Sequence, residues 1–349
     1  MPCGRAWSVR SCAIVAPACP ARRHRLCDDE RYPMDIDILL WLQDLRLAAG
    51  PAVEHAFVLL SSLSINALFL LVPFGIYWCF DKAKGFLAIA SFAMANASNQ
   101  LVKNTATVYR PWIRDARIQP AAEALGEATG YSFPSGHTVT ATTTIGALGW
   151  AWRKRVWPLV LTVLYVLLVA FSRNFLGCHT PQDVLVALVE SCLVIWFTSR
   201  LITWVDAAEG RDLIVLVAGL VLVVAFLVYV TVKPYPIDYV DGKLLVDPAK
   251  MTVDCFKAGG CAAGFLVGWF MERRLVGFST EGIGAKQRVL RFVVGAVVVL
   301  LFHLVIGKAF SAFLGEFAAP LLRYGLTFFC AVFLAPLAFS LVEKRAFSK

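Results

Sequence analysis

Twelve residues, from Ser172 to Asp183, combine an arginine, a histidine and an aspartate at spacings that suit phosphoryl transfer. Arg173 stands six positions before His179, and Asp183 stands four positions after it. A guanidinium can bind two phosphate oxygens, and an unprotonated histidine can accept a phosphoryl group while a carboxylate fixes its tautomer. Pro181 and the apolar run after it predict a helix start, which would place His179 and Asp183 on one helix face. Taken alone, the stretch is equally compatible with a polar loop.

A second stretch, from Lys103 to Pro111, carries two further cations. Lys103 and Arg110 are seven residues apart, so on a helix they would share one face at a distance of two turns. Pro111 predicts the end of that helix. The two cations either bind one anion together or are a pair of snorkelling side chains at a membrane interface.

A third stretch runs from Tyr131 to His137 and is followed directly by an apolar segment. Pro134, Ser135 and Gly136 precede the predicted helix, whose free N-terminal amides and dipole favour an anion. Ser135 is also compatible with a simple N-cap role. His137 falls in the first helical turn, close to any group that those amides bind.

Composition assigns the chain to the membrane. Of its 349 residues, 59% are apolar and 16% are charged, and the mean hydropathy is +0.69. These values exclude an ordinary soluble domain. We predict an all-α fold, a polytopic membrane helical bundle of about nine transmembrane helices, because apolar runs of bilayer length recur along the sequence: near 54–80, 84–104, 136–152, 156–172, 182–204, 212–232, 255–271, 289–308 and 318–342.

The chain divides into four predicted regions. Residues 1–33 are interpreted as a disordered tail or as sequence upstream of the true start, with Met34 as an initiator. Residues 34–53 form an interfacial amphipathic segment. Residues 54–205 form a core that contains the three stretches, and residues 206–349 add transmembrane helices without a chemical motif. The spacing of the four N-terminal cysteines matches no zinc site: Cys3, Cys12, Cys19 and Cys27.

The distribution of lysine and arginine predicts the orientation. Counting the predicted spans between them places three basic connections on the same side of the membrane, and such connections favour the cytoplasm. They are residues 153–155, 273–291 and 344–349. The three chemical stretches then share the opposite, outer side. The basic loop that contains Arg110 and Arg117 is an exception to this rule, and we accept it because a basic outer loop suits an anionic substrate.

Together, the three stretches resemble the signature of the type 2 phosphatidic acid phosphatase superfamily. That signature is Lys-x6-Arg-Pro, then Pro-Ser-Gly-His, then Ser-Arg-x5-His-x3-Asp. The chain carries all three elements in order, in Lys103–Pro111, Pro134–His137 and Ser172–Asp183. It departs from the family in having Trp112 where many members have a further arginine, and Ala187 where glycine is frequent.

The resemblance is secure for about residues 84 to 205, and the predicted nine-span layout is similar to that of glucose-6-phosphatase and the sphingosine-phosphate phosphatases. It implies a core with a haloperoxidase-like fold and a metal-independent phosphatase that needs no cofactor. The phosphate would be held by three cations, a serine hydroxyl and a glycine amide: Lys103, Arg110, Arg173, Ser135 and Gly136. His179 would attack phosphorus and form a phosphohistidine, Asp183 would orient it, and His137 would protonate the leaving alkoxide.

The main hypothesis is therefore a multi-pass enzyme of the cell membrane that hydrolyses a phosphate monoester or diphosphate of a lipid at the extracytoplasmic side. One alternative is a phosphatase of a soluble sugar phosphate, and another is a non-catalytic lipid or phosphate transporter. The expected partners are a phosphorylated lipid and the membrane, without nucleic acid, and a homodimer is left open. Glu190, seven residues after Asp183, is predicted to form structural hydrogen bonds inside the bundle.

Overall fold

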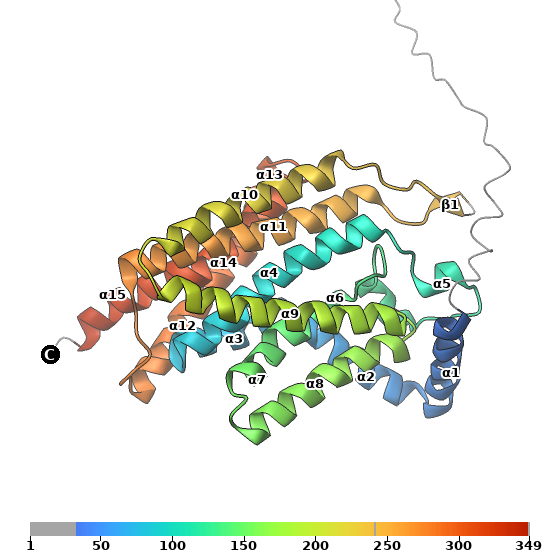
Figure 1. The fold of residues 1–349 in the computed structure, drawn as a ribbon, viewed down its shortest axis with the longest axis horizontal. Helices are drawn as coiled ribbons and strands as arrows, with labels where there is room; N and C mark the ends of the chain where they lie inside the picture. The colour runs from blue at the N-terminus through green and yellow to red at the C-terminus, as the bar shows by residue number, and fades with distance from the viewer. Residues whose placement is uncertain (1–32, 241, 348–349) are drawn as a thin grey trace, which may run out of the picture. The chain divides into compact units, whose positions relative to one another are not determined.

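The computed structural model describes residues 33–240 and 242–347, and this part of the chain is almost entirely helical (Figure 1). The predictions for residues 1–32 lie outside the described residues. The first half contains α-helices and short 3₁₀ or π turns in this order: α1 Pro33–Ala49, α2 Pro51–Ile65, η2 Ala67–Leu70, α3 Leu71–Cys79, α4 Lys82–Ala106, α5 Pro111–Arg114, η3 Ala122–Glu127, α6 Gly136–Ala141, η4 Thr142–Gly146, α7 Ala147–Ala151, α8 Val156–Phe175 and α9 Pro181–Asp206.

The second half is also helical, apart from one short ribbon. Its elements are α10 Arg211–Val232, β1 Tyr239–Val240, β2 Lys243–Leu244, α11 Pro248–Met271, η5 Glu272–Val276, α12 Ala285–Leu300, η6 Leu301–Ile306, α13 Gly307–Phe313, α14 Ala318–Phe329, η7 Cys330–Leu334 and α15 Ala335–Phe347. β1 and β2 pair antiparallel, with Tyr239 opposite Leu244. The predicted all-α fold did not include this ribbon.

Side-chain caps and prolines set several helix starts. Asp81 accepts a hydrogen bond from the Lys84 amide at 3.0 Å and caps α4, and Asp247 accepts one from the Ala249 amide at 2.9 Å and caps α11. Proline occupies an initial position of α2, α9 and α11, where its missing N–H is not needed. These local signals explain why the helix starts lie close to the predicted ones.

Among residues 33–240 and 242–347, five helices are long and apolar enough to cross a membrane: α8, α9, α10, Ala285–Val305 and Ala318–Arg345. The number becomes six if α1 and α2, which are bent by 118° at Gly50, count as one broken span. The chain is thus a multi-pass membrane protein. The nine-span layout stays a prediction, because the predicted span 54–80 is divided among α2, η2 and α3, and 136–152 among α6, η4 and α7.

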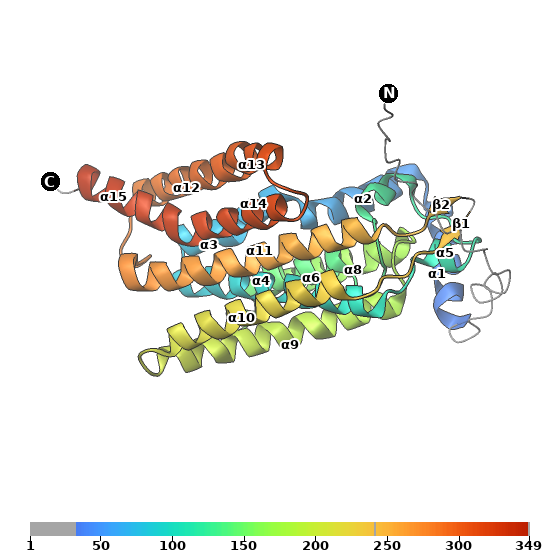
Figure 2. The same ribbon diagram turned by 90° about the horizontal axis from the view of Figure 1, so that it is seen from above.

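Helix α4 lies at the centre of the first half, and it packs against α3, α6, α9 and α11. Glu190 of α9 accepts hydrogen bonds from Ser98 of α4 at 2.7 Å and from Asn99 at 3.5 Å, as predicted. Figure 2 shows α11 between α4 and the layer formed by α12 to α14. Because α11 also packs against α10 and α14, it connects the second half of the chain to the first.

The two ends of α4 differ in chemistry. Lys82 and Lys103 are 21 residues apart, which corresponds to about 31 Å along a helix, close to the thickness of a bilayer core. At the Lys82 end, the ammonium contacts Glu272 at 2.7 Å, and Lys84 lies over the Trp152 ring at 5.7 Å. Two of the predicted basic connections, residues 153–155 and 273–291, therefore lie next to this end, away from Lys103.

The close contact of α11 with α14 depends on glycine. A Cβ atom at Gly264 would lie 1.9 Å from the carbonyl oxygen of Gly325, and one at Gly260 would lie 2.3 Å from that of Leu321. Small residues allow this kind of backbone approach between membrane helices.

We expect Gly264→Val to destabilise the protein by about 1–3 kcal/mol or more, because the added side chain meets backbone that cannot move aside. Thermal unfolding in detergent measures this change. Gly315→Val is the matched control, since a Cβ atom there has no neighbour within 4 Å. Equal melting temperatures for the two variants would contradict the proposed packing constraint.

Candidate active site

The structure brings the predicted polar side chains of the three stretches into one buried cluster at the Lys103 end of α4. None of the seven is more than 6% exposed: Lys103, Arg110, Ser135, His137, Arg173, His179 and Asp183. Gly136 lies beside them as the first residue of α6. The cluster therefore combines three cations, two histidines and one carboxylate that are largely removed from solvent.

Lys103 binds the backbone of the third stretch. Its ammonium donates to the carbonyl oxygens of Pro134 at 2.7 Å, Tyr131 at 3.2 Å and Ser132 at 3.4 Å. The end of α4 is thereby joined to the segment that leads into α6. All these acceptors are neutral, so the ammonium charge has no formal counter-charge among them.

The prediction that Lys103 and Arg110 share a helix face is wrong. Helix α4 ends at Ala106, and Thr107 adopts a left-handed conformation with φ of 49°. The chain then turns away, and Pro111 begins α5 instead of ending α4. The two cations still meet at one site, because the loop directs Arg110 back towards it.

Arg110 is fixed by neutral acceptors on two sides of the cluster. Nε donates to the Gly130 carbonyl at 3.0 Å, and Nη2 donates to that of Thr129 at 3.1 Å. Nη1 contacts the Cys178 carbonyl at 3.0 Å and Nε2 of His179 at 2.8 Å. Burial lowers the pKa of the Arg110 guanidinium to about 10, so this group still carries its charge at neutral pH.

The contact between Arg110 and His179 defines the histidine tautomer. A guanidinium has no acceptor, so Nε2 of His179 must accept and the ring hydrogen must lie on Nδ1. Burial, followed by the charges of Arg110 and Arg173, holds the pKa of His179 well below its ordinary value. The neutral ring thus has its lone pair on the nitrogen that faces the cations.

His179 and Asp183 do pair, although not by sharing a helix face. Helix α9 begins at Pro181, after His179, so that part of the prediction is wrong. Thr180 is the N-cap, and its hydroxyl accepts from the Asp183 amide at 3.3 Å while Asp183 Oδ2 accepts from the Thr180 amide at 2.8 Å. This reciprocal capping box directs the carboxylate backwards, where Oδ2 lies 3.4 Å from His179 Nδ1.

Arg173 carries buried hydrogen-bond donors that remain unused. The side chain is 0% exposed, and Nη1 donates to the Ser61 hydroxyl at 2.6 Å. Within the described part of the chain, Nε and Nη2 have no partner. An unsatisfied buried donor costs about 1–3 kcal/mol, and more when it is charged, so this guanidinium is suited to an anion that arrives later.

His137 lies on the other side of the cluster, one residue after Gly136. Ser135 is the N-cap of α6, as one prediction had it, and its hydroxyl accepts from the Thr138 amide at 3.5 Å. Nε2 of His137 lies 3.3 Å from Oε2 of Glu127. The hydrogen bond with His137 lowers the pKa of Glu127, which keeps a negative charge beside the histidine.

Comparison with known protein families covers both halves of the chain. Residues 84–207 match the family model described as PAP2 superfamily, and residues 256–346 match the one described as PAP2 superfamily phosphatase, transmembrane extension. Together these matches cover more than half of the chain. The chain belongs to the PAP2 superfamily. The resemblance inferred from the three stretches is thus confirmed.

Individual relatives match over shorter segments. The chain is 36% identical to phosphatidylglycerophosphatase B of Escherichia coli over 78 residues, which are 22% of this chain and 29% of the relative. It is 29% identical to undecaprenyl-diphosphatase of Sulfolobus acidocaldarius over 101 residues, 29% of this chain and 47% of that relative. The chain therefore spans less than half the length of these curated relatives. No solved structure matches it.

Four polar residues of this PAP2 site were missed by the sequence analysis: Ser61, Glu127, Ser132 and Asn174. Asn174 donates to the His179 carbonyl at 2.8 Å and stabilises the turn before α9. Ser132 and Asn174 stand close to motif residues in the sequence, and this proximity could have indicated that they belong to the site. Ser61 and Glu127 lie outside the motifs, and their types and spacing gave no comparable signal.

The segment that precedes the transmembrane extension also reaches the site. Between α10 and α11, Asp238 accepts a hydrogen bond from the Tyr109 hydroxyl at 2.6 Å, and Lys233 donates to the Asn104 carbonyl. A Cβ atom at Gly130 would lie 2.3 Å from the Met251 side chain. The segment from Lys233 to Met251 therefore supports the loop that carries Arg110.

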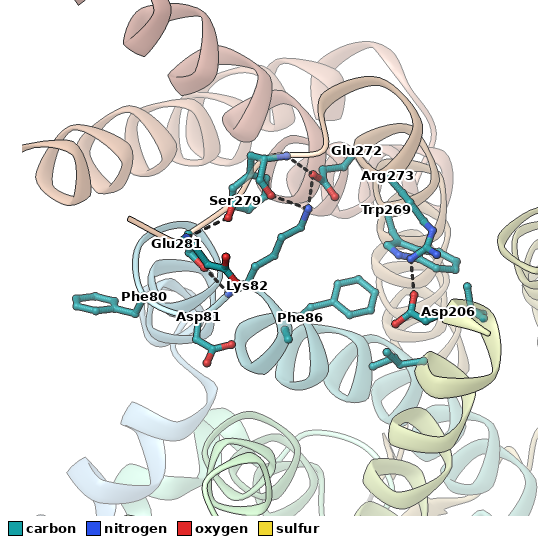
Figure 3. A pocket seen from close by; sticks show the side chains of 15 residues that line it. Phe80, Asp81, Lys82, Phe86, Asp206, Trp269, Glu272, Arg273, Ser279 and Glu281 are labelled. Atoms are coloured by element: carbon teal, nitrogen blue, oxygen red, sulfur yellow. Dashed lines mark hydrogen bonds and ion pairs between the residues drawn. The ribbon is translucent and has the colours of Figure 1, made fainter. Parts of the chain in front are cut away.

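Two cavities lie at opposite ends of the protein. One, of about 640 Å³, is lined by Thr129, Lys250, Lys257 and Arg323 among others, and Thr129 is also a backbone acceptor of Arg110. The other, of about 460 Å³, lies at the Lys82 end and contains no motif residue (Figure 3). There the charged groups bind one another, as Arg273 binds Asp206 at 2.6 Å.

In residues 33–240 and 242–347, no three His, Cys, Asp or Glu side chains are grouped as metal ligands. The metal independence that the family resemblance implies nevertheless stays a prediction.

We expect Tyr109→Phe to lower the melting temperature and to raise KM, because the lost bond to Asp238 anchors the residue next to Arg110. A hydrogen bond to a charged group contributes about 1.5–3 kcal/mol. Tyr239→Phe, a change on the exposed ribbon, serves as the control. Unchanged KM and stability in Tyr109→Phe would show that the segment between α10 and α11 does not support the site.

Proposed function

We propose that this PAP2 protein is a phosphatase that hydrolyses a phosphate monoester or diphosphate of a lipid through a phosphohistidine. One observation carries the proposal: Arg173 presents two unused buried donors beside two histidines, Lys103 and Arg110. A buried cluster of cations whose acceptors are neutral is unfavourable without an anion. A phosphoryl group supplies both the negative charge and the missing acceptors.

Three cations would bind the phosphate oxygens in this scheme. Arg173 offers Nε and Nη2, and Lys103 and Arg110 add charge from the opposite side. The Ser135 hydroxyl and the Gly136 amide, at the start of α6, complete the cradle. Phosphoryl transfer depends mainly on positioning and charge stabilisation, and these groups provide both.

His179 would act as the nucleophile. When the phosphate binds, Arg110 donates to a phosphate oxygen instead of to Nε2 of His179. The lone pair of Nε2 is then free to attack phosphorus. The bond from Nε2 to phosphorus forms as the phosphorus–oxygen bond to the leaving group breaks, and His137 gives its proton to that oxygen. Asp183, whose Oδ2 lies 3.4 Å from Nδ1, stabilises the positive charge that develops on the ring.

The second half of the reaction restores the enzyme. A water molecule gives a proton to His137 and attacks phosphorus, and the phosphorus–nitrogen bond breaks. Inorganic phosphate leaves, and Arg110 returns to Nε2. All atoms and charges balance without a further reactant.

The location at the outer face of the cell membrane is part of the proposal. It is supported by the basic connections at the Lys82 end, because such connections favour the cytoplasm. The names of the relatives, a phosphatidylglycerophosphatase and an undecaprenyl-diphosphatase, support a lipid substrate. The nine-span layout and the haloperoxidase-like core are kept in the proposal as predictions from the resemblance.

A soluble sugar phosphate is the second candidate substrate. The polar cavity of about 640 Å³ beside Thr129 favours this option, since it could hold a hydroxylated group next to the phosphate. A non-catalytic transporter is less well supported, because binding alone would not need His137, His179 and Asp183 in their present arrangement.

Purified protein in detergent should release phosphate in EDTA from one class among a panel of lipid and sugar phosphates. We expect His179→Ala to abolish turnover, because no other group takes its place as nucleophile. Asp183→Asn should retain a residual rate, since an asparagine preserves the cap. The substrate that is hydrolysed distinguishes lipid from sugar. Activity of His179→Ala at the wild-type rate would exclude the phosphohistidine route.

Arg173→Met should abolish turnover while leaving the protein as stable as the wild type or more stable by about 1–3 kcal/mol, because it removes unsatisfied buried donors. Thermal unfolding with and without vanadate or phosphate measures this effect. Both anions should stabilise the wild type and leave the variant unchanged. A strongly destabilised variant would instead indicate a structural arginine.

The rate should depend on pH in a bell shape. The lowered pKa of His179 means that its proton leaves at lower pH than usual, so the neutral nucleophile persists below the ordinary value of about 6.5. The acid limb should therefore lie below pH ~6.5. Burial, followed by the charge of Arg173, lowers the pKa of His137 to about 3 in the present structure. The negative charge of the bound substrate raises this pKa, so loss of the His137 proton should give the alkaline limb in kcat, which reports the substrate complex. A rate that rises steadily to high pH would contradict the assigned roles.

A further inference from the structure

Ser132 is a buried serine of the third stretch, next to Tyr131, and it is not part of the Pro134–His137 signature. It is 1% exposed. Its amide donates to the Val108 carbonyl at 2.7 Å, and its carbonyl accepts from Lys103 at 3.4 Å. The backbone of Ser132 is thus held by the stretch that supplies two of the cations, and its side chain has a defined position.

The Ser132 hydroxyl points to the two residues proposed for the nucleophile. Oγ lies 2.5 Å from Oδ2 of Asp183 and 3.4 Å from Nδ1 of His179. An ionised carboxylate can only accept, so the hydroxyl hydrogen is directed to Asp183. The lone pairs of Oγ remain available on the side of Nδ1–H.

Direct contact between His179 and Asp183 is weak in comparison. Oδ2 of Asp183 already accepts from Ser132 at 2.5 Å and from the Thr180 amide at 2.8 Å, whereas Nδ1 is 3.4 Å away. Because a carboxylate oxygen has two lone pairs in its plane, a third donor has no well-directed site. The hydroxyl is the remaining acceptor for Nδ1–H.

Two buried serines on neighbouring helices, Ser172 and Ser191, use their hydroxyl groups differently. Ser191 donates to the Ala187 carbonyl at 2.7 Å, and Ser172 donates to that of Val169 at 2.6 Å. Both bonds stay within one helix and are ordinary for a buried serine. Ser132 instead binds charged and titratable side chains across two segments.

We propose that Ser132 is a positioning residue that links Asp183 to His179 and holds the imidazole with Nε2 towards phosphorus. The inference rests on the proposed phosphatase function. As positive charge develops on the His179 ring, Nδ1 keeps its proton and donates it in a hydrogen bond to Oγ of Ser132. The Ser132 hydroxyl continues to donate to Asp183. Ser132 forms no covalent bond in either half-reaction, and no proton is transferred to it.

The test compares Ser132→Ala with Ser191→Ala, a matched buried serine on the same helix as Asp183. We expect Ser132→Ala to lower kcat roughly 10- to 100-fold, from the loss of a hydrogen bond to a charged group. KM should change little, because the phosphate-binding groups are intact. Ser191→Ala should keep the wild-type kcat. A wild-type kcat in Ser132→Ala, or an equal loss in both variants, would overturn the inference.

Non-additivity separates positioning from general packing. If Ser132 and Asp183 act as one unit, the double variant Ser132→Ala with Asp183→Asn should be no slower than the slower single variant. Fully additive losses would overturn the link. Ser132→Cys, which keeps the volume of the side chain, covers the case in which Ser132→Ala fails to fold; it should fold and show the same low kcat.

The outcomes also distinguish this inference from the function on which it rests. If the wild type releases no phosphate from any substrate, the proposed function itself fails. If the wild type is active and His179→Ala is inactive, but Ser132→Ala and Ser132→Cys match the wild type, only the role of Ser132 is lost.

Discussion

The burial of three cations among neutral acceptors is the constraint on which the rest of the site depends. Lys103 and Arg110 are surrounded by backbone carbonyls, and Arg173 keeps two donors unused. Carbonyl oxygens orient these groups without neutralising them, so a strong positive field persists in a region of low dielectric. Carboxylates in the same places would have stabilised the empty protein and competed with an anionic substrate. The segment from Thr129 to Pro134 is shaped by this need, since it supplies most of the carbonyls.

The second half of the chain gains a physical role from this arrangement. The loop after α4 has no helix of its own to hold it, because Thr107 breaks α4 before Arg110 is reached. Asp238, Lys233 and Met251 contact that loop or its neighbours from the segment between α10 and the start of α11. The glycines of α11 bring α14 close, which fixes α11 and therefore the segment that precedes it. The second half of the chain thus supports the loop that carries Arg110, in addition to any role within the bilayer.

The sequence was sufficient to predict which stretches meet, but not how they meet. Counting the apolar runs between the three stretches predicted that they share one side of the membrane, and the structure does bring them together at one end of α4. The helix-face arguments for Lys103 with Arg110 and for His179 with Asp183 were wrong, because both pairs cross a helix boundary where single φ angles and caps decide direction. Ser61 and Glu127 could not be found, since contacts between residues far apart in sequence leave no periodic signal. Residue type predicted the chemistry better than periodicity predicted the geometry.

In the proposed mechanism, Arg110 connects substrate binding to the availability of the nucleophile. In the empty site its Nη1 occupies Nε2 of His179 at 2.8 Å, so the lone pair that would attack phosphorus is already engaged. A phosphate oxygen is a stronger acceptor for this guanidinium than a neutral imidazole, because the anion adds Coulomb attraction between opposite charges. The anion therefore draws the guanidinium away and releases Nε2 in the same event. A neutral molecule of similar size cannot do this, so selectivity for phosphate follows from a competition for one donor.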